Sequence, residues 1–318
     1  MVFYIFIFII SILFLILSSD WLIKSLTKIA QFLGWREFVF ALFAMAFAGS
    51  LPNLFVGLNS IVKGVPSLSL GDILGGNIVD LTIVVGLAAL ISKNGLTIKS
   101  RTVQGTAIFT LIVALLPLFL IYDRFLSRLD GIILISVFII YVFWLFSKEE
   151  RFTRIFDENE KKAGLKEILK NLVILICSLV LLLLSSEGIV RSSMFFAETL
   201  NLPLVFIGLL VVGLGNALPE AFFSIQAARK GDDWMVVGSV MGAVISAATL
   251  ILGIIALLSP IQLDYYDVSR LSVARIFLII SAVSFLLFIR SGHRITKKEG
   301  IYFLIIYLIF VLVQIFIL

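Results

Sequence analysis

Most of the chain consists of apolar segments about 20 residues long, separated by short polar connections. Hydrophobic residues make up 61% of the 318 residues, charged residues make up 14%, and the mean hydropathy is +1.17. A soluble core of this size could not bury so much apolar surface. Lipid offers no partners for backbone polar groups, and the alternating ten-residue strands of an outer-membrane barrel are absent. The sequence therefore predicts an all-α polytopic membrane protein.

Ten transmembrane helices are predicted. They lie near residues 2–31, 37–63, 68–92, 101–122, 129–147, 166–198, 203–228, 234–258, 269–290 and 299–317. The first lacks a basic n-region and a small-residue cleavage site, so we expect a mature span and not a signal peptide. A single cysteine and a single histidine exclude an internal disulfide and argue against a His-rich metal site.

The basic residues divide unequally between the two sides that these spans define. Of the 25 Lys and Arg residues, 19 fall on one side, and the other side has only Lys63, Arg124, Arg128, Arg191, Arg270 and Arg275. The positive-inside rule makes the rich side cytoplasmic and puts both termini outside the plasma membrane. This asymmetry explains the net charge of +5, so no nucleic-acid partner is expected. The expected partners are the lipid bilayer and inorganic cations, and the oligomeric state stays open, a monomer being sufficient.

One pattern of small and helix-bending residues occurs twice, 167 residues apart and without a gap. Ten identities in 36 aligned positions pair the first-copy residues Leu51, Pro52, Phe55, Lys63, Gly64, Gly71, Gly75, Ile78, Thr82 and Gly86 with the second copy. Five spans per half force the second half to be inverted. We therefore predict a first repeat at 1–147, a cytoplasmic linker at 148–165 and an inverted repeat at 166–318. Inverted repeats are a transporter architecture with the site near the bilayer midplane.

The second span of each repeat carries glycine and proline in its middle, as Gly49 with Pro52 and as Gly215 with Pro219. Proline removes a backbone donor and clashes with the carbonyl four residues earlier, which leaves carbonyls free. An ordinary kinked helix is the alternative for either proline alone. Their occurrence at matched positions favours an ion site with backbone carbonyl ligands at two helix breaks.

Two carboxylates, Asp80 and Glu220, lie well inside apolar segments. An ionisable group there costs at least ~2.5 kcal/mol and marks an ion or proton pathway, although a protonated, hydrogen-bonded acid is the alternative. Ser50, Asn53 and Asn216 would add neutral oxygen ligands. Such a hard oxygen cage suits Ca²⁺ or Na⁺, with Asp80, Glu220 and Asn53 as the expected metal ligands.

Small residues four apart follow each proline-containing span. They are Gly71, Gly75, Gly238 and Gly242. This spacing lets helix backbones approach closely, and we expect the approach to bring the two site carboxylates within reach of each other.

Three further acids have simpler explanations. Asp20 stands four residues before Lys24, and Glu187 stands four before Arg191, which is the spacing of helical ion pairs. Asp72 lies near the start of its span, where we expect it to complement the helix dipole.

The motifs resemble a known family. The Gly-Ser-Leu-Pro-Asn and Gly-Asn-Ala-Leu-Pro-Glu segments, each followed by Gly-x-x-x-Gly, resemble the two α-repeats of the cation/calcium antiporter superfamily, the sodium/calcium exchangers. Ser19, Asp20 and Trp21 also resemble the first span of prokaryotic members. The resemblance implies a Ca²⁺ transporter driven by counter-flow of Na⁺ or H⁺, without a cofactor. It also implies that the first and sixth helices slide against a core of eight.

The chain also departs from the family pattern. The family usually has Glu after both prolines, whereas here the first copy has Asn53. The later Asn or Asp of the family is Asp80 in the first copy but Ala247 in the second. Ser50 remains, but hydroxyls that ligate Na⁺ in the family are replaced at Gly76, Ala217 and Ala243. These changes should weaken Ca²⁺ binding and disfavour a three-for-one stoichiometry.

We therefore expect a secondary antiporter that exchanges Ca²⁺ for Na⁺ or H⁺ by alternating access. The same fold moving K⁺, Mg²⁺, or Na⁺ against H⁺ is a second hypothesis. A channel, or a membrane partner that no longer transports, is a third. An enzyme is not expected, because the sequence has no nucleophile and base pair and no phosphate-binding loop.

Overall fold

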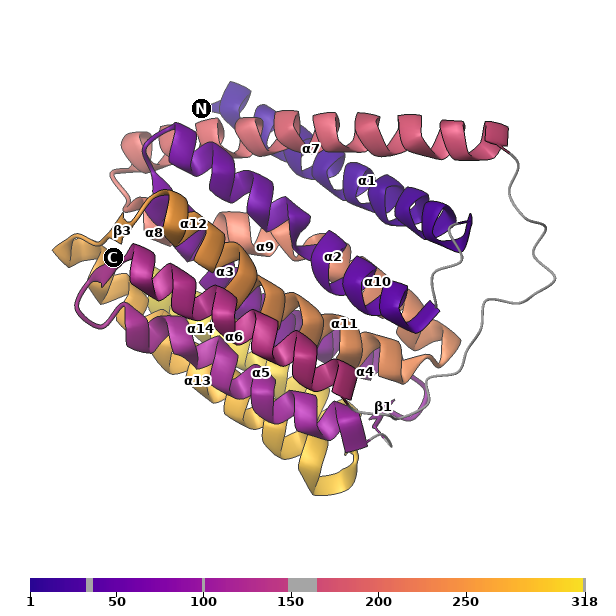
Figure 1. Ribbon diagram of the computed structural model, residues 1–318. Coiled ribbons are helices and arrows are strands. Elements are labelled where there is room, and N and C mark those ends of the chain that lie inside the picture. The colour runs from indigo at the N-terminus through magenta and orange to yellow at the C-terminus, as the bar shows by residue number, and fades with distance from the viewer. Residues whose placement is uncertain (33–36, 99–100, 148–164, 317–318) are drawn as a thin grey trace.

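A computed structural model describes residues 1–32, 37–98, 101–147 and 165–316, and it is almost entirely helical (Figure 1). The first half comprises α1 (Val2–Phe32), α2 (Glu37–Val62), α3 (Pro66–Val79), η1 (Asp80–Val84), α4 (Val85–Ile91), β1 (Leu96–Thr97), α5 (Arg101–Leu120), β2 (Phe125–Leu126) and α6 (Arg128–Ser147). The second half comprises α7 (Leu165–Leu200), α8 (Leu204–Ile207), η2 (Gly208–Val212), α9 (Gly213–Asn216), α10 (Leu218–Lys230), α11 (Asp233–Ile245), η3 (Ser246–Ile251), α12 (Leu252–Leu258), β3 (Ile261–Gln262), α13 (Tyr265–Gly292), β4 (Arg294–Ile295) and α14 (Lys297–Phe316).

The helices have the length and composition of membrane spans. Within the described residues, eight helical segments are long and apolar enough to cross a bilayer, and Ser50–Val62 and Gly105–Leu120 are shorter apolar helices. Large apolar side chains such as Phe6, Phe143 and Leu184 are exposed on the outside, as contact with lipid requires. The predicted all-α membrane class is confirmed.

The centre of the molecule is built from two repeat-related helical rods. In the segment Pro66–Ile91, 83% of the most apolar window is buried, and in Asp233–Leu258 the share is 78%, against 28% in Val2–Leu26. Each rod passes from an α-helix through a π-helical turn, η1 or η3, and back to an α-helix.

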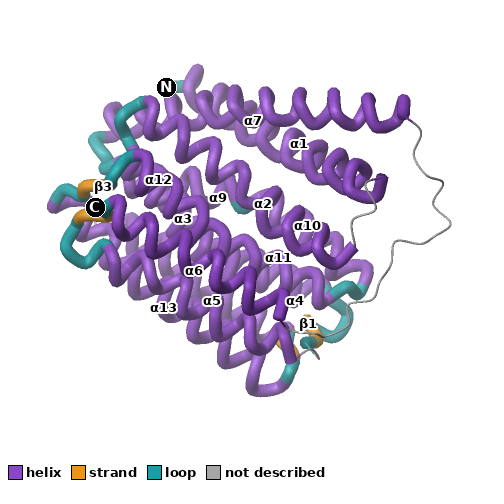
Figure 2. Tube along the Cα trace, viewed as in Figure 1, coloured by secondary structure: helices purple, strands orange, loops and turns teal. Residues whose placement is uncertain are grey.

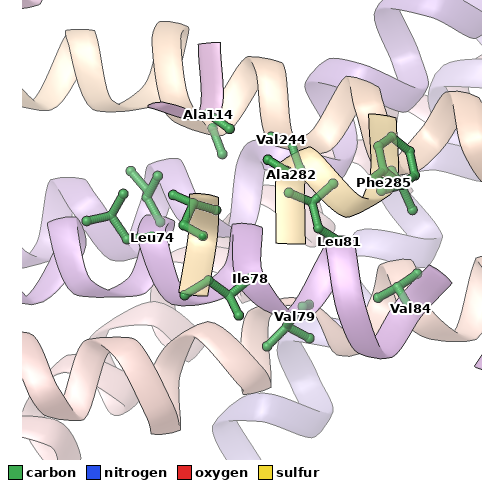
Figure 3. Packing of buried hydrophobic residues seen from close by; sticks show 14 of the residues in the cluster. Leu74, Ile78, Val79, Leu81, Val84, Ala114, Val244, Ala282 and Phe285 are labelled. Carbon is green, nitrogen blue, oxygen red and sulfur yellow. The ribbon is translucent and has the colours of Figure 1, made fainter. Parts of the chain in front are cut away.

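Apolar side chains from both halves interlock around these rods. Figure 3 shows Leu74 and Leu81 of the first rod with Val244 of the second and Phe285 of α13, all of them fully buried. Full burial of side chains this large stabilises each by about 1.5–3 kcal/mol relative to exposure in water. In lipid the gain comes instead from close packing, because lipid tails are as apolar as the core.

The expected close approach of backbones occurs between α3 and the α8–η2–α9 segment. A Cβ atom added at Gly75 would collide with the backbone carbonyl of Leu209. One added at Gly213 would lie 2.7 Å from the Gly76 nitrogen and 2.9 Å from the Asp72 carbonyl oxygen. Glycine on both surfaces therefore allows contact without side chains between them. Gly238, by contrast, has no atom within 4 Å of an added Cβ, so the prediction fails at that position.

Helices α1 and α7 lie side by side along one face of the bundle (Figures 1 and 2). Their rings meet near one end, with Tyr4 and Phe195 stacked at 4.0 Å between centroids and Phe8 edge-on to Phe196 at 5.8 Å. A separate buried apolar cluster joins this pair to α2, α3 and the second half. The first and sixth predicted spans thus form a layer against the rest of the bundle.

Two short antiparallel ladders tie loops of the first half to loops of the second. Strand β1 pairs with β4, Leu96 opposite Ile295, and β2 pairs with β3, Leu126 opposite Ile261. The labelled strands β1 and β3 lie at opposite ends of the bundle, and both chain termini lie at the β3 end (Figure 1). Among the described residues, a strand pairing therefore joins the two halves at each end of the bundle.

Replacing Gly75 by Ala should destabilise the protein by about 1–3 kcal/mol, because the added Cβ overlaps an immobile backbone carbonyl. Gly238→Ala serves as the control, because this glycine belongs to the second copy of the same motif but has open space around an added Cβ, so the change should be neutral or slightly stabilising. Thermal unfolding in detergent compares the two variants. Equal unfolding temperatures would contradict the assigned backbone contact.

Candidate cation site

The helix that carries Pro219 is interrupted at one residue. Helix α9 ends at Asn216, Ala217 has φ −82° and ψ −4°, and α10 begins at Leu218. The proline stands in the first turn of α10, where its missing N–H removes no helical hydrogen bond. The predicted break beside Gly215 is therefore present.

The first copy differs, because α2 continues through Pro52 without interruption. The expectation of a second break was wrong. A proline inside a membrane helix removes one backbone hydrogen bond, and neighbouring groups can compensate for this loss without ending the helix. The contacts of Gly49, the other residue of this motif, lie outside what the structure describes.

Asn216 connects three helices at the centre of the bundle. Its Nδ2 atom donates to Asn53 Oδ1 on α2 at 2.9 Å and lies 2.9 Å from both carboxylate oxygens of Asp72 on α3. Asn216 is 3% exposed and Asp72 is fully buried. Two of the predicted neutral ligands, Asn53 and Asn216, are thus brought together from opposite repeats.

Asp72 does not complement a helix dipole, so that interpretation was wrong. Helix α3 begins at Pro66 and has no acidic residue in its first turn. Asp72 is more than a full turn further along and faces the second repeat. The sequence contained a signal for this, because the helix-starting residue Pro66 stands six positions earlier.

Asp80 and Glu220 come from opposite repeats and lie on two elements that pack against each other. Asp80 is the first residue of η1, and α10, which carries Glu220, packs against that turn. The carboxylate of Glu220 lies near enough to those of Asp80 and Asp72 for their charges to interact when they are ionised. Asp80 Oδ1 and Glu220 Oε2 are buried and have no hydrogen-bond partner within the described structure. Buried acceptors without donors require a cation, a proton or water.

Ser50, the remaining predicted ligand, forms a hydrogen bond between its hydroxyl and that of Ser246. Ser246 opens η3 and also donates to the Gly242 carbonyl at 2.8 Å. The repeat-related position in the first copy is Val79, so sequence symmetry gave no reason to select Ser246. The structure adds it to the polar groups near the site.

The central helices contain three π-helical turns, which no local sequence pattern predicted, and Asp80 and Ser246 are the first residues of two of them. Turns η1 and η3 are repeat-related, and in each a threonine hydroxyl donates to the carbonyl four residues earlier, Thr82 to Ile78 and Thr249 to Ile245. The turn η2 precedes the break at Ala217. Such turns widen a helix and occur frequently at functional sites. The identity of Thr82 and Thr249 between the copies was the available signal.

The candidate donor set is therefore two buried carboxylates from opposite repeats together with amide and hydroxyl oxygens. Among the described residues, no group of three or more His, Cys, Asp or Glu side chains is placed to hold a metal ion together. A cation here would need neutral oxygens to complete its shell. Oxygen donors of this kind suit hard cations such as Ca²⁺ and Na⁺.

The outer acids form the expected helical ion pairs. Lys24 Nζ lies 2.6 Å from Asp20 Oδ2, and Arg191 Nε donates to Glu187 Oε1 at 2.9 Å. Glu187 also pairs at 3.2 Å with Lys63, the residue directly after α2, which links α7 to the end of that helix. Both predictions are confirmed.

Comparison with known proteins decides the family. Residues 3–147 and 170–316 match the family described as sodium/calcium exchanger protein. The chain belongs to the sodium/calcium exchanger family. This confirms the resemblance drawn from the two α-repeat motifs.

Relatives of this exchanger-family chain align over nearly its full length. The sodium/calcium exchanger MaX1 of Methanosarcina acetivorans is 28% identical over 98% of each chain. An uncharacterized membrane protein of Methanocaldococcus jannaschii, MJ0091, is 27% identical over 95% of each. A solved structure of the sodium-calcium exchanger NCX_Mj, soaked with Na⁺ and Sr²⁺, has a TM-score of 0.66 and 26% identity, and the match covers 97% of both chains. The fold of this family member is thus that of an exchanger throughout.

Because the outer acids form half-exposed ion pairs, Asp20→Asn and Glu187→Gln should each change the free energy of unfolding by no more than about 1 kcal/mol. Neither change should alter cation affinity. Unfolding curves and cation titrations of the two purified variants test both expectations. Loss of cation binding in either variant would show that these acids belong to the site.

Proposed function

We propose that this protein is a secondary active antiporter that exchanges Ca²⁺ for Na⁺ or H⁺ by alternating access near the bilayer midplane. Asp80 and Glu220 are the anionic ligands, and Ser50, Asn53 and Asn216 supply neutral oxygens. The observation that carries the proposal is the pair of buried carboxylates, one from each repeat, with oxygens that lack hydrogen-bond donors. Exchanger relatives that align along the whole chain support it.

The proposed topology has ten spans in two inverted five-helix repeats. The repeats are 1–147 and 166–318, the linker 148–165 is cytoplasmic, and both termini lie outside the plasma membrane. The helical rods α3–η1–α4 and α11–η3–α12, which lie centrally and have matching π turns, support the repeat. The two strand ladders at opposite ends of the bundle agree with an inverted arrangement (Figure 1).

Alternating access is proposed to occur between two layers, with α1 and α7 sliding as a unit against the other helices. Their packing on one face of the bundle supports this division. In the structure, the ion pair between Lys63 and Glu187 and the hydrogen bond from Asn59 to Ser186 cross the boundary. Sliding would have to break or exchange these contacts.

Charge balance limits what the site can exchange. Two ionised carboxylates are neutralised by one divalent cation, by two monovalent cations or by two protons. One divalent cation can therefore be exchanged for two monovalent cations or two protons without a change in the net charge of the occupied site. Asn53 in place of a third carboxylate lowers the ligand charge, which should weaken Ca²⁺ binding.

A second candidate function is transport of another cation by the same site. The motivating observation is Ala247, which puts an apolar, buried residue where Asp80 stands in the first copy. K⁺, Mg²⁺, or Na⁺ exchanged for H⁺ would then be the substrate. The two functions are separated by measuring how each unlabelled ion competes with the uptake of radiolabelled Ca²⁺. If only Ca²⁺ and either Na⁺ or H⁺ inhibit this uptake, exchange of Ca²⁺ for Na⁺ or H⁺ is supported.

Glu220→Gln and Asp80→Asn should each abolish Ca²⁺ uptake into proteoliposomes driven by an outward Na⁺ or pH gradient, because the site loses half its charge. Glu198→Gln is the matched control, since Glu198 is an exposed acid on α7. Its uptake rate should stay within about twofold of the unmodified protein, as for a surface substitution.

Unchanged uptake in Glu220→Gln would refute the assigned site. Uptake by the unmodified protein that shows no dependence on either gradient would refute antiport.

A further inference from the structure

Asp72 is a buried carboxylate with few hydrogen-bond donors, and the exchanger function proposed above gives it no role. It is 0% exposed, and within the described residues the hydrogen bonds to its side chain come from Asn216 alone. An ionised carboxylate has about four acceptor positions, so one amide leaves most of them unfilled. Such a residue is costly at the centre of a membrane protein.

When it is ionised, the Asp72 carboxylate restricts the orientation of the Asn216 amide. A carboxylate can only accept hydrogen bonds, so the neighbouring amide must present its NH₂ group to it. The two N–H bonds of Asn216 are then divided between Asp72 and Asn53 Oδ1. The opposite end of the amide, Asn216 Oδ1, is buried and has no hydrogen-bond partner among the described atoms.

A buried carbonyl oxygen without a hydrogen-bond donor has a lone pair that can coordinate a cation. Glu220, whose Oε2 also lacks a partner, stands four residues further along the chain, on the next helical turn past the break. Without a fixed partner, an asparagine amide could rotate and offer NH₂ to the same space, where it would repel a cation.

We propose that Asp72 is a positioning residue of the cation site, which holds the Asn216 amide so that Asn216 Oδ1 faces the bound cation. The inference rests on the proposed cation site. Asp72 acts on the cation through Asn216 and does not join the ligands directly, in agreement with the lack of a three-acid group among the described residues.

The contact between Asp72 and Asn216 has no counterpart at the repeat-related positions. The backbone around Gly213 lies against that of Asp72 and Gly76, which sets α3 at hydrogen-bond distance from the end of α9. The repeat-related positions are Ser239 and Gly49, and a glycine cannot supply an amide side chain. Ser239 instead donates to the carbonyl of Val236 on its own helix at 3.0 Å.

A double-mutant cycle tests the proposal by isothermal titration of the purified full chain with Ca²⁺. Asp72→Ala should raise the Ca²⁺ Kd about tenfold or more, since a hydrogen bond to a charged group is lost. Asn216→Ala should have a similar effect, and the double variant should be no weaker than the worse single variant, because both changes remove the same ligand oxygen. Ser239→Ala, the matched control, should leave Kd unchanged.

Asp72→Asn provides a second test if the alanine variant is unstable. Its side-chain carbonyl can still accept from Asn216, so its loss of affinity should be smaller than that of Asp72→Ala. Unchanged affinity in Asp72→Ala, or losses that multiply in the double variant, would overturn the positioning role. If the unmodified protein shows no heat with Ca²⁺, Na⁺ or K⁺, the proposed cation site itself fails, which is a distinguishable result.

Discussion

The central constraint on this protein is the burial of acceptor oxygens with too few donors. Asp72, Asp80 and Glu220 are each at least nine-tenths buried, and oxygens of the last two have no hydrogen-bond partner within the described structure. The lipid surroundings cannot supply donors, so the missing partners must be ions, protons or water. The same shortage of hydrogen-bond donors makes these oxygens suitable for binding a cation. If the protein itself supplied donors to all of them, a cation would have to displace those hydrogen bonds in order to bind.

The close packing of two backbone segments brings these oxygens together from two distant parts of the chain. Glycines on α3 and on the α8–η2–α9 segment let the two backbones touch, which puts Asp72 beside Asn216. Glu220 follows the break at Ala217, Asp80 opens the π turn η1, and the helix α10 that carries Glu220 packs against this turn. The α1–α7 layer lies on one face of this core.

Much of this could be predicted from the sequence, because glycine, proline and membrane-embedded acids leave strong patterns. The membrane helices, the outer ion pairs and the break at Pro219 follow from local rules of spacing and backbone chemistry. The interpretation of Asp72 failed because the start of α3 decides whether an acid is in the first turn, and helix boundaries are the least certain part of a sequence prediction. The continuity of α2 through Pro52 and the contact of Ser50 with Ser246 depend on neighbouring helices, which no local pattern describes.

The central claim is that one pair of carboxylates binds Ca²⁺ and the coupling ion in turn. The most direct test is equilibrium titration of the purified protein with Ca²⁺ at several fixed Na⁺ concentrations and at two pH values. A shared site predicts that the apparent Ca²⁺ Kd rises with Na⁺ concentration, with acidification, or with both, because the competing ion occupies the same oxygens. A Ca²⁺ isotherm that neither Na⁺ nor pH changes would contradict the account.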